Sequence, residues 1–388
     1  MEFKRCYGCM RELDAPGAVC PHCGFDNSKT TEREWPDALP CGTILAGQYI
    51  TGQPQDHELS GITYLAYDLK LEQPVFIREL FPVSGVYRFL QDGRDLQWNT
   101  VDSAEWIRGF TERGRRAARL RNTEHIAAVQ NFFYENKTAY IVTDYAEGET
   151  LDSRRQDICA DGEKRLIELL LPVMRELEDA HKHGVIHCGI TPKRLLLRPD
   201  GSLVLTGLGT TEEHIICFGD HDDVYIPNRA VPENAIEYYS AKKEPGPWTD
   251  VYGICATIYD CVADKPLPRA MERLSEVMQI DFEPFRPAVA QTLEAGLALR
   301  AKDRIQSVKE LRKRLEAALR ADEDSFMKMP GCIYGPPPDG YEDSFLREPV
   351  DVYGPPSEWE ERDSTLDVPP TVYGPPRLKW WQRLGRKK

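Results

Sequence analysis

Four cysteines near the N-terminus have the spacing of a metal site. They form two CxxC pairs, "CYGC" and "CPHC", which are separated by ten residues. Each pair offers two thiolates from one tight turn, and two such turns supply the tetrahedral ligands that Zn²⁺ prefers, whereas free or redox-active thiols are the alternative. A segment this short cannot build a hydrophobic core, so a metal would stabilise it. The pattern predicts a zinc ribbon over residues 1–27 that binds one structural zinc through Cys6, Cys9, Cys20 and Cys23.

A second stretch, "HGVIHCGITPKRLLLRPDGSLVLTGLG" at residues 183–209, has the rhythm of two short strands around a loop. It lacks the carboxylates that phosphoryl transfer needs as a base and as Mg²⁺ ligands. His187 and Cys188 are two reactive side chains at its centre. We interpret Cys188 as a small buried hydrophobe, which is the common role of free cysteine.

The elements that must position these residues fall into two sections. Short β-branched or aromatic runs predict strands, and apolar residues at a spacing of three to four predict helices. The strands are expected at 63–70, 74–80 and 138–145. The helices are expected at 103–121, 162–184, 249–264, 288–302 and 307–321. A small sheet-rich lobe followed by a larger helical lobe is an α+β arrangement.

Composition and charge limit the number of domains and the kinds of partner that the chain can have. Its 388 residues suffice for more than one domain, and a net charge of −14 does not favour nucleic acid as a partner. The sequence has no apolar run long enough to span a bilayer and no apolar signal core at its start, so we expect a cytoplasmic protein. The predicted parts are the ribbon (1–27), a polar linker (28–40), a central domain (41–320, with lobes 41–146 and 147–320) and a Pro-rich tail (321–388).

Eight stretches of the central domain carry a resemblance to a known family. In chain order they are "GITYLAYD", "VFIREL", "NTEHIAAVQNFFYENKTAYIVTDYAEGETL", "HGVIHCGITPKRLLL", "LVLTGLG", "AVPENAIEYYS", "WTDVYGICATIYD" and "KDRIQSVKEL". They resemble bacterial Ser/Thr protein kinases, from the strand after the glycine-rich loop, through the V-A-I-K strand, the catalytic loop and the D-F-G strand, to the last conserved segment. The resemblance implies a bilobal protein kinase-like fold.

Function has to be argued from the site and not from the fold. The three glycines of the family's phosphate loop correspond to Asp56, Glu58 and Gly61, so only the third is retained. Two carboxylates at this place would repel a triphosphate, and we interpret them as an ordinary acidic hairpin tip.

The family's lysine–glutamate pair is also altered. The lysine of V-A-I-K corresponds to Arg78, whose planar guanidinium places its charge differently. Its glutamate partner falls on Arg113, one residue after Glu112. A pair of Arg78 with Glu112, shifted by one residue, is the alternative.

The resemblance places the catalytic loop on residues that cannot do its chemistry. The family's proton-accepting Asp corresponds to Gly189, and its phosphate-steadying lysine to Thr191. The metal-binding Asn corresponds to Arg194, and the D-F-G Asp to Gly207. Neither glycine has a side chain, and Arg194 is a cation where Mg²⁺ would sit.

The family's structural residues are retained. Asp250 corresponds to the residue that anchors the catalytic-loop backbone. Arg304 corresponds to the arginine that pairs with the A-P-E glutamate. Glu233 has the better local match for that glutamate, whereas Glu237 has the more usual spacing to Asp250, and we favour Glu237.

These replacements predict a pseudokinase, a catalytically inactive kinase-like protein that acts as a signalling scaffold or allosteric interaction module. ATP and Mg²⁺ are not expected to bind. The alternative is an atypical ATP-dependent Ser/Thr kinase with displaced catalytic residues, with a metal held by Glu79, Asp220, Asp222 or Asp223.

The tail predicts a partner-binding segment. Its "YGPP" motif occurs three times, at Tyr334, Tyr353 and Tyr373, among acidic spacers whose composition is typical of disorder. Extended Pro-Pro motifs repeated on such a chain are typical of multivalent binding to a protein partner, and a merely repetitive linker is the alternative. In the basic end "RLKWWQRLGRKK", Trp380 and Trp381 could make weak contact with an anionic membrane or dock on the acidic body of the chain.

Overall fold

The computed structural model describes most of the chain up to residue 327. The described ranges are 3–15, 17–30, 35–58, 60–82, 85–88, 94–99, 103–120, 123–210, 235–239, 245–263, 265–275 and 280–327. The chain divides into two units, Met1–Met329 and Pro330–Lys388, and every described residue belongs to the first. Within the described ranges, no helix has both the length and the apolar character that crossing a membrane requires.

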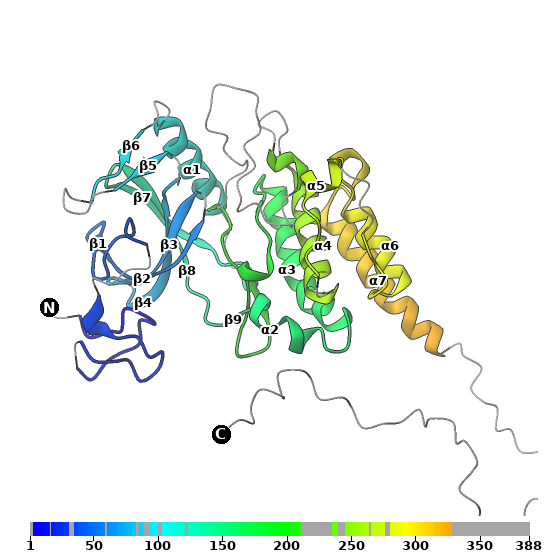
Figure 1. Ribbon diagram of the computed structural model, residues 1–388, viewed down its shortest axis with the longest axis horizontal. Helices are drawn as coiled ribbons and strands as arrows, with labels where there is room; N and C mark the ends of the chain where they lie inside the picture. The colour runs from blue at the N-terminus through cyan, green and yellow to red at the C-terminus, as the bar shows by residue number, and fades with distance from the viewer. Residues whose placement is uncertain are drawn as a thin grey trace, which may run out of the picture. The chain divides into compact units, whose positions relative to one another are not determined.

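The small lobe is built on one six-stranded antiparallel sheet (Figure 1). Its strand order is β1-β2-β3-β4-β8-β7. The bounds are β1 (Ile44–Leu45), β2 (Tyr49–Glu58), β3 (Gly61–Asp68), β4 (Gln73–Leu80), β7 (Val129–Glu135) and β8 (Thr138–Asp144). The three strands that we expected are therefore present, as β3, β4 and β8.

One face of this sheet packs against the chain that precedes it. Tyr64, Ile77 and Tyr140 share this face because side chains alternate along a strand. Ala38 and Leu39 are fully buried against them, so part of the stretch assigned to a polar linker belongs to the core. The short pair β5 (Val86–Tyr87) and β6 (Gln97–Trp98) contributes Val86 to the same cluster.

The opposite face of the sheet carries helix α1 (Ser103–Ala117) and faces the large lobe. Phe110 of α1 and Ile141 of β8 lie in the main hydrophobic cluster, which continues into the large lobe. Gly114 sits where α1 meets the sheet, and a Cβ there would lie 2.8 Å from Ile141. A glycine at this position lets the helix approach the strand closely.

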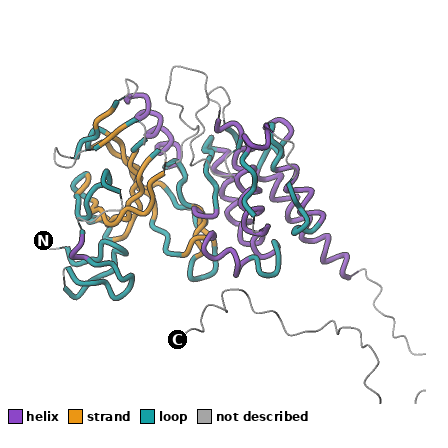
Figure 2. Tube along the Cα trace, in the orientation of Figure 1, coloured by secondary structure: helices purple, strands orange, loops and turns teal. Residues whose placement is uncertain are grey.

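The large lobe is helical (Figure 2). Its helices are α2 (Leu151–Ile158), α3 (Lys164–Lys182), α4 (Pro247–Ala263), α5 (Ala270–Ser275), α6 (Pro287–Gly296) and α7 (Val308–Met327). Helix α3 ends just before Gly184, whose φ of +72° suits glycine. Helix α4 is buried almost all round, as expected of a central helix. Helix α7 continues past residue 320, where we expected the tail to begin.

A small three-stranded sheet and a short 3₁₀ turn lie where the two lobes meet, and they flank the loop that resembles a catalytic loop. The order is β11-β10-β9, with β9 (Glu149–Thr150), β10 (Leu195–Leu197) and β11 (Leu203–Leu205). The 3₁₀ turn Pro192–Arg194 leads directly into β10. The expected α+β arrangement of a sheet-rich lobe followed by a helical lobe is confirmed. The other 3₁₀ turns among the described residues are Asn27–Lys29, Ile236–Tyr239 and Ala301–Asp303.

Candidate functional site

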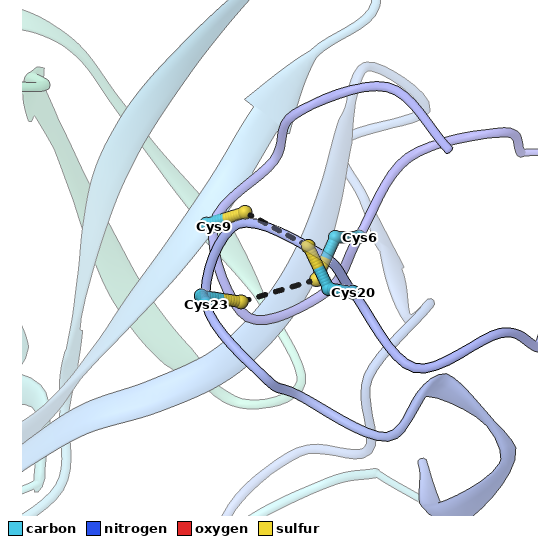
Figure 3. A group of neighbouring side chains, drawn as sticks. All are labelled: Cys6, Cys9, Cys20 and Cys23. Atoms are coloured by element: carbon cyan, nitrogen blue, oxygen red, sulfur yellow. Dashed lines mark hydrogen bonds between the residues drawn. The ribbon is translucent and has the colours of Figure 1, made fainter. Parts of the chain in front are cut away.

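The four N-terminal cysteines converge on one point (Figure 3). Their sulfur atoms all lie within 4.8 Å of one another. The Sγ–Sγ separations are 3.6 Å for Cys6–Cys23 and 3.7 Å for Cys9–Cys20, and all four are free thiols. Four sulfurs at about 2.3 Å from a tetrahedral ion would lie about 3.8 Å apart. The cluster therefore has the dimensions of a site for one metal ion.

The groups around the sulfurs act on the ionisation of different thiols in opposite directions. The amide of Gly8 donates to Cys6 Sγ at 3.2 Å, and Asn27 Nδ2 approaches the same sulfur at 3.6 Å. Although burial acts against it, hydrogen bonds from the amides of Cys23 and His22 lower the pKa of Cys20 to about 7. Burial raises the pKa of Cys23 to about 12, so full ionisation of the cluster calls for a cation at its centre.

The second site lies between the lobes and is centred on Arg78 of β4. This side chain is 4% exposed. Its Nη1 donates to Asp56 Oδ1 at 2.7 Å and to Thr63 Oγ1 at 2.9 Å. Its Nη2 donates to Glu58 Oε2 at 3.0 Å and to Ser60 Oγ at 3.2 Å. The residues at the first two phosphate-loop positions thus bind the residue at the lysine position.

Glu58 also joins the two lobes. Its Oε2 accepts a hydrogen bond from Arg194 Nη2 of the large lobe. Although burial acts against it, the charges of Arg194 and Arg78 hold the pKa of Glu58 down at about 2. Two carboxylates and two guanidiniums therefore form one neutral cluster, the cleft cluster, made of Asp56, Glu58, Arg78 and Arg194.

This geometry corrects one interpretation made from the sequence. Asp56 and Glu58 are not an ordinary acidic hairpin tip, because they turn inward onto Arg78. The alternative pair of Arg78 with Glu112 is not formed either, since Glu112 pairs with Arg115 at 3.1 Å on the surface of α1. The resemblance to the kinase family located the residues at the phosphate-loop positions, but it did not predict the direction in which their side chains point.

Glu79, the next residue along β4, faces the other side of the sheet. Its Oε2 accepts from Tyr64 Oη at 2.8 Å, and its Oε1 accepts from Tyr140 Oη at 2.6 Å. Arg88 completes a buried ion pair with it and also donates to the carbonyl of Asp37 at 2.9 Å. Glu79 therefore cannot hold a metal in the cleft. No sequence pattern indicated this network, because Arg88 lies outside any regular periodicity.

Asp250 anchors the backbone of the loop at 187–190. Its carboxylate accepts from the amides of His187 at 2.9 Å and Cys188 at 2.8 Å, and His181 Nε2 lies 2.7 Å from it. His187 is fully buried, and this burial lowers its pKa to about 4. Cys188 is also buried, with a φ of +59°. Gly189 offers no side chain where an acid–base group would be needed.

Gly207 completes the cleft. Its φ is +94°, and a Cβ built on it would lie 3.1 Å from Arg194 Nη1. This conformation is one that glycine adopts readily and other residues rarely do. A side chain at position 207 would therefore meet the guanidinium of Arg194, and the two replacements are compatible with each other.

Arg304 and Glu237 form a buried ion pair inside the large lobe. Arg304 Nη1 donates to Glu237 Oε1 at 2.7 Å and to the carbonyl of Trp248 at 2.9 Å. Its Nε and Nη2 donate to the carbonyls of Ala298 and Leu299. Glu237, the glutamate favoured for this role, contacts Arg304. Several other predicted residues lie outside the described ranges: Glu233, Asp220, Asp222, Asp223, Tyr334, Tyr353, Tyr373, Trp380 and Trp381.

Known proteins share this architecture. A profile of the protein kinase domain matches residues 110–321. The chain is 24% identical to a probable serine/threonine-protein kinase of Clostridium perfringens over 186 residues, which is 45% of this chain and 26% of the relative. It is 25% identical to serine/threonine-protein kinase PknA of Mycobacterium tuberculosis over 170 residues, which is 42% of this chain and 38% of the relative. A solved structure described as the apo form of PpkA-294 is similar in fold, with a TM-score of 0.55 and 23% identity over 72% of this chain and 99% of that chain.

The two lobes, with a loop between them anchored by a buried aspartate, define the bilobal kinase fold. The profile match covers more than half of the chain, and the chain belongs to the protein kinase domain family. The resemblance carried by the eight sequence stretches is confirmed. The chain spans about a quarter to two-fifths of the length of the two curated relatives that it matches.

Proposed function

We propose that this protein is a pseudokinase, a kinase-like protein that serves as a signalling scaffold or allosteric interaction module and does not transfer phosphate. The cleft cluster carries the proposal. Its two guanidiniums, at the lysine and metal-binding positions, are already neutralised by carboxylates of the same chain. A triphosphate would have to displace Asp56 and Glu58, and Mg²⁺ would meet Arg194 in place of an oxygen ligand.

A thermal-shift titration with ATP tests this proposal. Because a ligand that binds only the folded state raises its stability, a bound nucleotide would raise Tm. We expect no rise in Tm with ATP, with or without Mg²⁺. A rise that requires Mg²⁺ would overturn the proposal.

A variant carrying Asp56→Asn and Glu58→Gln tests the cause of this behaviour. It removes both negative charges that neutralise Arg78 and Arg194, so their positive charges could attract polyphosphate. We expect its Tm to rise with ATP in the absence of Mg²⁺. Glu310→Gln, which removes the charge of a carboxylate on the surface of α7, is the control and should behave as the wild type does.

The second candidate is an atypical ATP-dependent Ser/Thr kinase with displaced catalytic residues. The similarity to relatives that are described as serine/threonine-protein kinases favours it. Transfer of labelled phosphate from ATP to protein, abolished by Arg78→Ala, would support this candidate against the first.

We further propose that the four-cysteine site holds one structural zinc ion. All four coordination positions would be filled by sulfur, so the metal would stabilise the two CxxC turns and leave no position for a substrate. Metal analysis should find about one zinc per chain, lost when Cys6 and Cys9 become serine. A protein purified without metal, and folded over residues 3–30, would contradict this assignment.

The YGPP motifs at Tyr334, Tyr353 and Tyr373 are proposed to bind a protein partner, with no role for nucleic acid. A pull-down with the full chain should retain a partner that the triple Tyr→Ala variant loses. Equal retention by both proteins would make the repeats a spacer. Sedimentation with anionic vesicles, compared with a Trp380→Ala and Trp381→Ala variant, tests the weak membrane contact proposed for the basic end.

A further inference from the structure

The cysteine knuckles pack directly on the small lobe. They form the knuckle module, which comprises residues 3–15 and 17–30. In its first CxxC turn the carbonyl of Tyr7 accepts a hydrogen bond from the amide of Gln53 in β2, at 2.8 Å. The module lies beside the strands of the small lobe in Figure 1. The metal-binding turn itself therefore makes the contact.

Met10, which directly follows Cys9, inserts into the small lobe. It is 2% exposed and forms one hydrophobic cluster with Leu65 and Tyr67 of β3, together with Phe76 of β4 and Tyr145. Its φ of +60° is unusual for a residue with a side chain, and the turn is closed by its amide bonding to the carbonyl of Cys6 at 2.7 Å. The geometry of the first CxxC turn thus sets the direction of this side chain.

Gly52 shows how close this contact is. A Cβ on this residue of β2 would lie 2.3 Å from the terminal methyl of Met10 and 2.3 Å from the carbonyl oxygen of Tyr7. No other residue type fits here without movement of the module. The strand and the knuckle are therefore matched to each other.

Charged residues of the module extend the contact to the connection between the lobes. The guanidinium of Arg5 lies 4.3 Å from the centroid of the Tyr67 ring. Arg11 forms an ion pair with Glu147, which lies in the connection between β8 and β9. The ring of Tyr145, two residues earlier, lies 5.2 Å from that of Phe76. The module covers both the sheet and the start of the large lobe.

We propose that the metal site controls access to an apolar surface of the small lobe, made of Leu65, Tyr67, Phe76 and Tyr145. The surface is covered by the module when the metal is bound and is exposed when the metal is lost. This proposal rests on the proposed zinc site and not on the absence of phosphotransfer.

The physical reason is that the module has almost no core of its own. Its internal cluster consists of Leu13, Cys6 and Cys20, with Cys9 and Phe25 packed against it. Without a metal, four neighbouring thiols give little to hold the two turns together, and small four-cysteine modules of this kind unfold. Met10 would then leave its site, and the adjoining segments 49–54 and 144–148 of the chain would lose the packing and the hydrogen bond that the module supplies.

Hydrogen exchange of the full chain, with and without removal of zinc by a chelator, tests this proposal. We expect amides in three segments, 3–30, 49–54 and 144–148, to exchange at least about tenfold faster after zinc removal. Amides of helix α4 in the large lobe should not change. Faster exchange in 3–30 alone would overturn the proposal, because the module would then be an independent appendage. Faster exchange throughout the domain would also overturn it, because the metal would then support the whole fold.

Met10→Gly separates docking from metal binding. Glycine tolerates a φ of +60°, so the variant removes the inserted side chain without straining the turn. We expect it to keep one zinc per chain while 49–54 and 144–148 gain exchange. Val19→Ala is the matched control, because Val19 is an apolar residue of the same module that is 61% exposed. Normal protection in Met10→Gly would overturn the proposal, and a protein without zinc in any variant would instead contradict the assignment of the metal.

Discussion

Two arginine–carboxylate clusters in this protein differ in what surrounds them. The Arg304–Glu237 pair of the large lobe is dry, with side chains 0% and 2% exposed. In the cleft cluster Arg78 is 4% exposed, whereas its partners Asp56 and Glu58 are 46% and 38% exposed. The first pair lies inside one lobe, where water cannot take the place of either partner. In the second, the carboxylates of Asp56 and Glu58 are partly exposed to solvent, so they can exchange their arginine partner for water or for a ligand.

The largest effect is expected when the dry pair is broken. Arg304→Ala should lower the free energy of unfolding by about 3 to 5 kcal/mol, because it leaves Glu237 buried without a counter-charge. Denaturant unfolding followed by circular dichroism measures this. Arg314→Ala on the exposed surface of α7 is the control and should change stability by less than about 1 kcal/mol. An equal loss in both variants would remove the distinction between the clusters.

A smaller effect is expected in the cleft. Glu58→Gln should reduce stability by about 1 to 2 kcal/mol, which is less than the roughly 3 kcal/mol that its pKa shift alone corresponds to, because its carboxylate is partly in water. The same change should loosen the contact between the lobes, since Glu58 bonds to Arg194 across them. A pair of fluorescent labels, one on each lobe, measures the separation. A loss as large as that of Arg304→Ala would mean that the cleft is as dry as the large-lobe pair.

The pH dependence of the Glu58 effect sharpens the same comparison. The pKa of Glu58 is about 2 in the folded protein and about 4.3 for an ordinary glutamate. Its stabilising contribution is therefore complete above about pH 4.3 and is lost as the pH falls towards 2. The difference in stability between wild type and Glu58→Gln should be constant from pH 7 to 5 and should shrink below pH 4. A difference that changes between pH 7 and 6 would point to another titrating group.

The smallest effect at neutral pH concerns His187, a buried residue of the loop at 187–190. Its pKa of about 4 lies below the ordinary value of 6.5, so it stays neutral in the folded protein while the unfolded chain takes up a proton below pH 6.5. His187 should therefore lower stability only as the pH falls from 6.5 to 4, by at most about 1.4 kcal/mol per pH unit. Subtracting the pH profile of His187→Gln from that of the wild type isolates this contribution. A contribution that is flat over this range would show that His187 is charged in the fold.

Sequence alone predicted what depends on local pattern and chain order. The strands at β3, β4 and β8 and the helix over 164–182 follow from periodicity. The preference for Glu237 followed from its spacing to Asp250. The grouping of the four cysteines into one cluster could be predicted from their spacing alone.

Contacts between distant residues could not be predicted in this way. The 136 residues that separate Glu58 from Arg194 carry no pattern that relates the two side chains. The burial of Ala38 and Leu39, and the insertion of Met10, likewise depend on which surface the folded sheet presents. Such pairings are decided by packing in three dimensions and not by the period of a strand or helix.

The cleft cluster bears on how the proposed loss of phosphotransfer could be reversed. Restoring the family's asparagine at Arg194 alone would leave Glu58 bound to Arg78 and still in the place of the phosphates. Restoring glycine at Asp56 and Glu58 alone would remove the carboxylates that pair with the guanidiniums of Arg78 and Arg194, which is less stable. Under the proposed function, each partial reversal would therefore leave the site closed, and only several simultaneous changes would reopen it. The internal neutralisation would then make the proposed loss of phosphotransfer hard to reverse by single substitutions.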